Sequence, residues 1–212
     1  IGAKYGYDLW QVGVGDTIRG YNRTTGAVSE ATVQSITYDD TLAGELATIR
    51  DLYLPNARNA LDIGFRLELD VPLDVGAGDL ISSPDRNGNG FEIRNTTVEN
   101  HRARGMLIKA SDGVIEDNVV DGSTIGGIVV AAEPTDWQEA SFAENLTIRN
   151  NTVRNTSRQK GQPGQEQTAG IAITSDYGWV GGQHANILVE GNTIENVAGA
   201  NLIVNYADGV QV

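Results

Sequence analysis

The sequence predicts an all-β protein, namely a parallel β-helix (solenoid) with a small antiparallel β-barrel-like module near the N-terminus. Three observations lead to this prediction. The composition is rich in aliphatic and β-branched residues and includes 26 glycines and 5 prolines, whereas long helical runs of Glu, Lys, Leu and Ala are missing. A gapless motif recurs four times in the C-terminal part. The N-terminal part lacks this motif and alternates in polarity instead.

The N-terminal part is divided as follows. Residues 1–8 are expected to be a partial β-helix coil, and residues 9–72 to be the antiparallel module, inserted into the helix. Turn-forming TTG and DDT separate alternating segments, which are predicted as strands at residues 16–22, 27–37, 45–51 and 65–70. The near copies VGVGDTI (12–18) and VGAGDLI (75–81) border this module. In each copy a Gly-Asp turn is expected to start a strand, and the second copy to return the chain to the β-helix of residues 73–212.

The repeat in the C-terminal part has a common template: an aliphatic residue, two variable residues, Asn, one variable residue, Val or Ile, one variable residue, Asn. A second short strand follows each copy. The copies are IRNTTVEN (93–100), IEDNVVDG (115–122), IRNNTVRN (148–155) and VEGNTIEN (189–196), and the second strands are GMLIKA, GIVVAA, GIAITS and NLIVNY. Two or three short strands per period of about 22 residues indicate stacked coils about 4.8 Å apart, since one coil cannot bury its aliphatic residues alone. The longer later offsets indicate inserted loops.

Two columns of asparagines follow from the template. Asn118, Asn151 and Asn192 form one column, and Asn100, Asn155 and Asn196 form the other. Asparagine tolerates left-handed turns, and stacked amides hydrogen-bond from coil to coil. We therefore expect these residues to be structural rather than ligand-binding.

Composition also limits the partners. A net charge of -13 and a pI near 4.4 disfavour nucleic acid and anionic membranes. The sequence has no cysteine and no apolar run of membrane-spanning length. Neither a cofactor nor a metal site is expected. The β-helix ends lack a capping helix, which leads us to expect either a fragment of a longer solenoid or self-association through uncapped ends.

Candidate functional residues cluster after the second strands. Asp112, Glu133, Asp176 and Asp208 fall within one residue of a common column. Two inserted loops flank this column and contribute Asp136, Trp137, Glu139, Tyr177, Trp179 and His184. Aromatic rings beside carboxylates form a reasonable sugar site, because rings stack on pyranose faces while acids hold hydroxyls or move protons. Each acid can also be an ordinary turn residue, each tryptophan can be loop packing, and His184 is expected to be a surface or satisfied side chain.

The stretch NHRARG connects a template strand to its second strand, and the matching turns at Ser123–Gly126 and Val197–Ala200 lack arginine. In extended backbone Arg102 and Arg104 project to the same side. A guanidinium pair can orient carboxylates or bind sugar hydroxyls. The alternative is a structural clamp that neutralises an acidic surface.

These residues resemble a known family. NHRARGMLI, VIEDNVVDG and the run EPTDWQEASFAENLTIRNN are similar to the right-handed parallel β-helix glycosidases, most closely the family 110 α-1,3-galactosidases of bacteria. The module between the two VGxGD copies resembles the barrel that this family inserts into its helix. The resemblance implies an exo-acting, inverting, metal-free hydrolase of terminal α-linked galactose. The family's adjacent aspartate pair, which precedes the barrel, has no counterpart here, since Asp39-Asp40 lies inside the module.

The sequence therefore predicts part of a secreted or periplasmic glycoside hydrolase that acts on an oligosaccharide or polysaccharide. The candidate catalytic residues are Glu133 and Asp176, and the candidate substrate-binding residues are Arg102, Arg104, Asp112, Asp136, Trp137 and Trp179. Two alternatives stay open. One is a non-catalytic glycan-binding or structural β-helix, and the other is a calcium-dependent polysaccharide lyase or epimerase, which needs an oxygen cage and a base.

Overall fold

The computed structural model describes residues 2–3, 12–39, 41, 63–133, 142–158, 167–175 and 183–212. Within these ranges the chain is all-β apart from short stretches of 3-10 helix, which confirms the predicted class. The chain divides into two compact units, one made of residues 1–87 and 133–140 and the other of residues 88–132 and 141–212. Among the described residues, none of the helical structure is long and apolar enough to cross a membrane.

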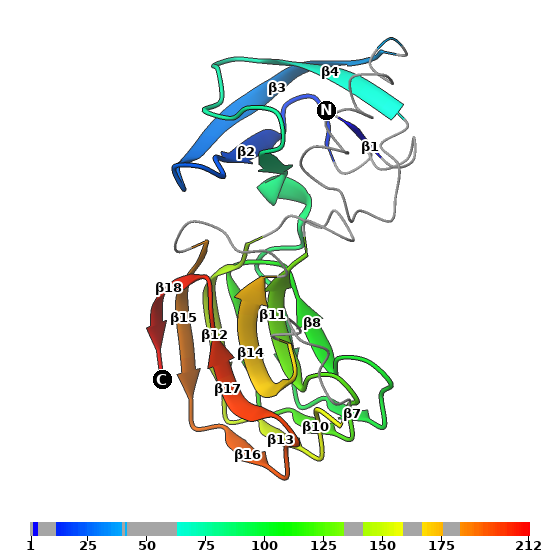
Figure 1. Ribbon diagram of the computed structural model, residues 1–212, viewed down its shortest axis with the longest axis vertical. Helices are drawn as coiled ribbons and strands as arrows, with labels where there is room; N and C mark the ends of the chain where they lie inside the picture. Colours follow the sequence, from blue (N-terminus) through cyan, green and yellow to red (C-terminus); the bar gives the residue numbers. More distant parts are fainter. Residues whose placement is uncertain are drawn as a thin grey trace. The chain divides into compact units, whose positions relative to one another are not determined.

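The N-terminal unit contains an antiparallel sheet with the strand order β1-β4-β3-β2-β5 (Figure 1). The strands are β1 (Gly2–Ala3), β2 (Thr17–Tyr21), β3 (Val28–Tyr38), β4 (Ile63–Leu69) and β5 (Leu80–Ser82), and the 3-10 helix η3 (Pro84–Arg86) follows. The sheet buries Ile18, Tyr21, Ala31 and Val33. The strands predicted at 16–22, 27–37 and 65–70 are present, whereas the predicted strand at 45–51 lies outside the described residues.

The two VGxGD copies make the same turn. The Gly13 N–H donates to Asp16 Oδ2 at 2.6 Å, and the Gly76 N–H donates to Asp79 Oδ2 at 2.8 Å. Each turn starts a strand, as predicted, and the two strands β2 and β5 then pair antiparallel with each other. The second copy therefore supplies the last strand of the antiparallel sheet rather than the first strand of the β-helix.

This pairing moves the boundary that we predicted from the sequence. Residues 73–87 belong to the N-terminal unit, and the first parallel strand begins at Glu92. At the other end, β1 pairs antiparallel with β4, so residues 2–3 are a sheet strand rather than part of a β-helix coil. The reason is edge pairing, because β1 and β5 cover the two edges of the sheet formed by β2, β3 and β4.

The second unit is the β-helix, with three sheets whose strands all pair parallel. The first sheet contains β6 (Glu92–Arg94), β9 (Gly113–Glu116), β12 (Glu144–Arg149), β15 (His184–Glu190) and β18 (Ala207–Gln211). The second contains β7 (Thr97–Glu99), β10 (Val119–Asp121), β13 (Thr152–Arg154) and β16 (Thr193–Glu195). The third contains β8 (Met106–Ile108), β11 (Ile128–Ala132), β14 (Ala169–Ser175) and β17 (Ala200–Val204). The first to fourth coils are thus β6–β8, β9–β11, β12–β14 and β15–β17 (Figure 1).

The register of the coils is the one that the repeat predicts. The first template positions Ile93, Ile115, Ile148 and Val189 pair with one another in that order, from one coil to the next. Their side chains join the second-strand aliphatics in a single interior cluster. Since each fully buried aliphatic side chain contributes about 1.5–3 kcal/mol, this interior supplies most of the stacking free energy.

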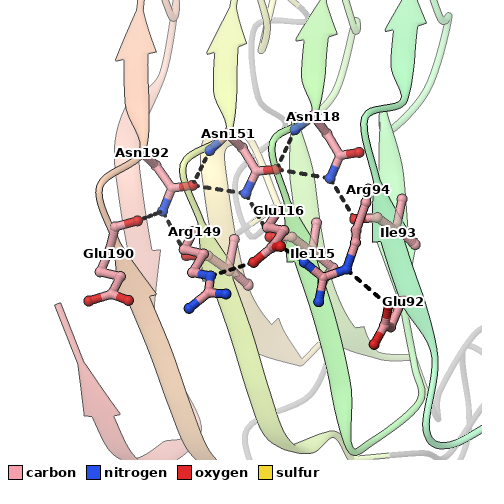
Figure 2. A network of polar contacts seen from close by, with 11 residues as sticks. Glu92, Ile93, Arg94, Ile115, Glu116, Asn118, Arg149, Asn151, Glu190 and Asn192 are labelled. Atoms are coloured by element: carbon pink, nitrogen blue, oxygen red, sulfur yellow. Dashed lines mark hydrogen bonds and ion pairs between the residues drawn. The ribbon is translucent and has the colours of Figure 1, made fainter.

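The predicted amide ladder runs along the turn between the first and second sheets (Figure 2). Asn118 Nδ2 donates to Asn151 Oδ1 at 3.0 Å, and Asn151 Nδ2 donates to Asn192 Oδ1 at 2.9 Å. The same two oxygens also accept the backbone N–H groups of Asn118 and Asn151, at 3.1 and 2.9 Å. Each amide thus satisfies buried polar groups of two coils, which is the structural role that the sequence predicts.

Left-handed backbone geometry is distributed differently from our expectation. In the ladder it falls on the residue before each asparagine, as in Asp117 (φ 54°) and Asn150 (φ 53°), rather than on the ladder residues themselves. In the second column Asn100, Asn155 and Asn196 are left-handed, as predicted. Burial explains the difference, because Asn118 and Asn151 are both 1% exposed and are selected for hydrogen bonding rather than for turn geometry.

A row of alternating charges crosses the outside of the first sheet beside this ladder (Figure 2). Arg94, Glu116 and Arg149 occupy paired positions on successive coils, and Glu116 makes ion pairs with both arginines. The Glu116 side chain is only 9% exposed. The buried carboxylate and its two guanidinium partners are therefore a structural cross-link between three coils.

Candidate functional site

The outside of the third sheet differs from the other surfaces because small apolar side chains line it. Val129, Ala131 and Ala172 point away from the interior, are completely buried and form a cluster of their own, against which Ile203 packs. We call this surface the outer face. These side chains are packed rather than open to solvent, and polar groups lie at the border of the face.

Arg104 lies at one border of the outer face, at the end of the turn that precedes β8. Its Nε donates to Gln167 Oε1 at 2.6 Å, so the contact joins the first coil to the third. The turn of the second coil lies between them and carries Gly126, where a Cβ atom would come within 2.4 Å of the Gln167 carbonyl oxygen. Glycine at this position thus permits the close approach of the second and third coils.

Arg102 is placed differently. The stretch from Arg102 to Gly105 is a series of bends rather than extended backbone, and Arg102 is exposed whereas Arg104 is half-buried. Within the part of the chain that the structure describes, Arg102 has no hydrogen-bond or ion-pair partner. The extended geometry that we expected for this pair is therefore absent, and only Arg104 is held in a fixed position.

A second cation lies on the outer face. Lys109 follows β8, and its Nζ donates to the Ala131 carbonyl oxygen of the next coil at 3.1 Å. The ammonium group is thus held over the small-residue floor. Gln167 and Lys109 were both absent from our predicted site.

Glu133, a predicted catalytic residue, directly follows the last residue of β11 and is 4% exposed. The preceding Ala132 pairs with Ser175, the last residue of β14. The next residue in the sequence after each of these strands is therefore acidic, Glu133 after one and Asp176 after the other. Asp176 itself lies outside the described residues.

Asp112 belongs to another column. It has a left-handed backbone (φ 56°), and its Oδ1 accepts a hydrogen bond from Asn145 Nδ2 at 2.8 Å. Asn186 continues this column by donating from Nδ2 to Asn145 Oδ1 at 3.2 Å. Asp208 pairs with Ala185, the residue before Asn186, and so lies one position away from this column. The strand register therefore places Asp112 and Asp208 at positions other than that of Glu133. The hydrogen-bond partner of Asp112 is Asn145, which also has a left-handed backbone.

The remaining predicted residues fall into two groups. Asp136, Trp137 and Trp179, together with Glu139 and Tyr177, lie outside the described residues. His184 is described and is completely buried. Its ring accepts a hydrogen bond from the Ala143 N–H at 3.0 Å and lies 2.8 Å from the Thr174 carbonyl oxygen, so it is the satisfied side chain that we predicted. Burial lowers the pKa of His184 to about 4.

No cluster of three or more His, Cys, Asp or Glu side chains suited to a metal ion occurs among the described residues. The groups on the outer face are an apolar floor, a guanidinium, an ammonium and an amide. The guanidinium, ammonium and amide groups can each form hydrogen bonds with hydroxyl groups of a ligand.

The sequence contains a signal for Lys109, one of the two residues that we missed, but none for the other, Gln167. Lys109 stands at an outward-facing position of its second strand, where alternation with the buried Ile108 points it away from the interior. Gln167 lies three residues before Gly170 in a long connection, and the template does not extend that far. Its contact with Arg104 depends on coil stacking and on the glycine at 126, which periodicity alone does not reveal.

Comparison with known proteins supports this fold. Residues 78–212 match the family model of the right-handed β-helix region. A protein named alpha-1,3-galactosidase B from Akkermansia muciniphila is 30% identical over 145 residues, which is 65% of this chain and 18% of that protein. Another of that name, from Bacteroides thetaiotaomicron, is 36% identical over 96 residues, or 42% of this chain and 15% of that protein. The chain thus spans under a fifth of the length of either relative.

The resemblance to β-helix galactosidases that the sequence predicts is confirmed by these matches. The family model covers more than half of the chain, including all four coils and β18. On the evidence of the coil register, the three parallel sheets and this match, the chain belongs to the right-handed β-helix family.

Proposed function

We propose that this chain forms part of the substrate-binding wall of a glycoside hydrolase that removes terminal α-linked galactose. The observation that carries the proposal is the 30% identity to an alpha-1,3-galactosidase B over 145 residues. Because the chain spans only 18% of that relative, the activity of a complete enzyme is part of the proposal.

The outer face supports a role in sugar binding. Lys109 is tied to the second coil, at 3.1 Å to Ala131, and Arg104 is tied to the third coil, at 2.6 Å to Gln167. Their cationic groups are therefore held in place before a ligand binds, which lowers the entropy lost on binding. We expect them to donate hydrogen bonds to galactose hydroxyls.

Chemistry in the proposed enzyme requires two carboxyl groups. In an inverting mechanism one carboxylic acid protonates the departing glycosidic oxygen while a carboxylate on the other side activates water. Glu133 and Asp176 are our candidates, since each directly follows a strand of the third sheet. Burial of Glu133 fits a group that is shielded from bulk water, as a general acid needs to be.

The experiment measures binding and turnover separately. Titration calorimetry with α-1,3-linked galactobiose is expected to detect binding by the wild-type chain and at least about tenfold weaker binding by Lys109→Ala, equal to one lost hydrogen bond of about 1.4 kcal/mol. Lys160→Ala, which changes a lysine that has no part in the proposal, is the control. Absence of binding by the wild-type chain would refute the proposal.

Turnover is assayed with an aryl α-galactoside. Release of the aryl alcohol that is lost in both Glu133→Gln and Asp176→Asn supports catalysis by this chain. Binding without release supports a glycan-binding module, the first of the alternatives above. Absorbance from unsaturated uronates in the presence of calcium would instead indicate a lyase.

A further inference from the structure

Two Asn-Gly pairs follow the 3-10 helix η3 in direct succession. They are Asn87-Gly88 and Asn89-Gly90. Asn87 is the last residue of the N-terminal unit, and Gly88 is the first residue of the β-helix unit. Both glycines have a left-handed backbone, with φ 73° and 78°, which explains why neither position has a side chain. Because the two pairs have the same side chains, a large difference in reactivity between them must come from the fold.

An Asn-Gly pair can react with itself by deamidation. The backbone nitrogen of the glycine attacks the side-chain carbonyl carbon of the asparagine and forms a C–N bond, and the side-chain nitrogen leaves as ammonia with the proton of the N–H. Water then opens the cyclic imide to aspartate or isoaspartate. The reaction therefore needs a glycine N–H that no other group holds, and an asparagine side chain that can turn toward it.

The second pair is held on both reacting groups. Asn89 Oδ1 accepts a hydrogen bond from the Ser111 N–H at 2.8 Å, and the Gly90 N–H donates to the Ser111 carbonyl oxygen at 3.0 Å. The Gly90 contact repeats on the next coil, where the Asp112 N–H donates to the Glu144 carbonyl oxygen at 2.9 Å. Asn89-Gly90 thus occupies a position of the β-helix stack just before β6, and its reaction requires that two hydrogen bonds open first.

The first pair lies before the stack. In the part of the chain that the structure describes, the Gly88 N–H has no hydrogen-bond partner. Gly88 is exposed, and a Cβ atom added there would have no other atom within 4 Å, so water and base can reach its nitrogen. Exposure of the asparagines alone would favour the other pair, because Asn89 is exposed whereas Asn87 is half-buried. The hydrogen bonds of the two glycine N–H groups favour Asn87.

We propose that Asn87 is a modification site, at which spontaneous deamidation produces aspartate or isoaspartate, and that Ser111 protects Asn89 from the same reaction. The product has one more negative charge at the junction of the two units. Since Asn87 precedes the stack, the stability of the β-helix is unchanged by the reaction. Isoaspartate at Asn89 would instead lengthen the main chain and shift Gly90 relative to Ser111. Neither step involves the proposed sugar chemistry.

Peptide mapping tests the selectivity. The folded chain is incubated at mildly alkaline pH, and trypsin, which cleaves after arginine, releases peptides that end at Arg94 and contain both pairs. Fragmentation assigns the mass gain of about 1 Da to one asparagine or the other. We expect Asn87 to react at least about tenfold faster than Asn89, as one protecting hydrogen bond implies. In urea, where Ser111 no longer protects Asn89, the two rates should agree within about threefold.

The outcomes decide between the fold and the local sequence. Equal rates in the folded chain, faster reaction at Asn89, or the same preference for Asn87 in urea would each overturn the inference. Asn89→Asp keeps an acceptor for the Ser111 N–H and should leave the rate at Asn87 unchanged, whereas Asn87→Gln should remove most of the mass gain. Asn87→Asp should unfold at the urea midpoint of the wild type, and a lower midpoint would show that Asn87 belongs to the stack after all.

Discussion

The amide ladder leads to a quantitative prediction for Asn151→Ala. The Asn151 side chain makes four hydrogen bonds: it donates to the Ile115 carbonyl oxygen and to Asn192 Oδ1, both at 2.9 Å, and it accepts from the backbone N–H and the Nδ2 of Asn118 at 3.1 and 3.0 Å. The residue is 1% exposed, so water cannot replace the lost partners without opening the coils.

The expected cost follows from which groups keep a partner. Asn118 Nδ2 still donates to the Ile93 carbonyl oxygen at 2.9 Å, and Asn192 Oδ1 still accepts the backbone N–H of residue 151 at 2.9 Å. The Asn118 backbone N–H loses its side-chain acceptor, and the Ile115 carbonyl loses its side-chain donor. At about 1–3 kcal/mol for each of these two groups, the free energy of unfolding of the β-helix should fall by about 2–6 kcal/mol.

The matched control is Asn192→Ala, at the same ladder position one coil later. Asn192 is half-exposed, and its Nδ2 donates to the carbonyl oxygens of Ile148 and Glu190 at 2.8 and 3.1 Å. Its Oδ1 accepts the backbone N–H and the Nδ2 of Asn151, both at 2.9 Å. Water can reach these groups after truncation, so we expect a cost of about 1–2 kcal/mol. Urea denaturation followed by far-ultraviolet circular dichroism measures both values. Equal costs for the two variants, or a cost below about 1 kcal/mol for Asn151→Ala, would refute the ladder argument.

Three further predictions concern other contacts of the β-helix. Gly127→Ala should lower the free energy of unfolding measured in urea by about 1–3 kcal/mol, because the added Cβ would lie 2.3 Å from Val153 Cγ1. The control Gly76→Ala should lower it far less, because the nearest atom to its added Cβ would be 4.0 Å away. Glu116→Gln should lower the free energy of unfolding by about 1–3 kcal/mol, since two arginines then lose their shared carboxylate. In 1 M NaCl, where the screening length is about 3 Å, the difference in this free energy between the variant and the wild type should be smaller. Burial lowers the pKa of His184 to about 4 from 6.5, so the unfolded chain binds a proton at a higher pH than the folded chain does. The free energy of unfolding should therefore decrease by on the order of 3 kcal/mol as the pH falls from 6.5 toward 4, and His184→Phe should lack this dependence. An identical pH profile in that variant would contradict the assignment of this pH dependence to His184.

Most of the β-helix could be predicted from the sequence because its physical requirements repeat. The positions of Ile93, Ile115, Ile148 and Val189 had to be aliphatic to fill one interior, and their pairing follows from the template alone. The Asn118 ladder could be predicted for the same reason, since a buried turn needs a donor and an acceptor on every coil. Periodicity thus gives both strand register and the polar groups that register brings together.

The limits of prediction lie where contacts do not repeat. Leu80–Ser82 follows a turn that could equally have led into a coil, and only pairing with β2 assigns it to the antiparallel sheet. Asp112 appeared to share a column with Glu133, but a shift of one residue moves a side chain to another face or turn, and Asn145 is its partner instead. The contact of Arg104 with Gln167 spans 63 residues and follows no template, so a single sequence contains no signal for it.

The unequal spacing of the coils indicates where this protein can change during evolution or be altered by engineering. From β8 to β9 the chain needs only residues 109–112, whereas the equivalent connection from β11 to β12 takes residues 133–143 and that from β14 to β15 takes residues 176–183. Strand pairing on either side is the same in all three cases. Length is thus accommodated in these connections without a change of register, so they are the positions at which foreign peptide sequences could be grafted, or homologues could acquire new specificities, while the stacked framework stays intact.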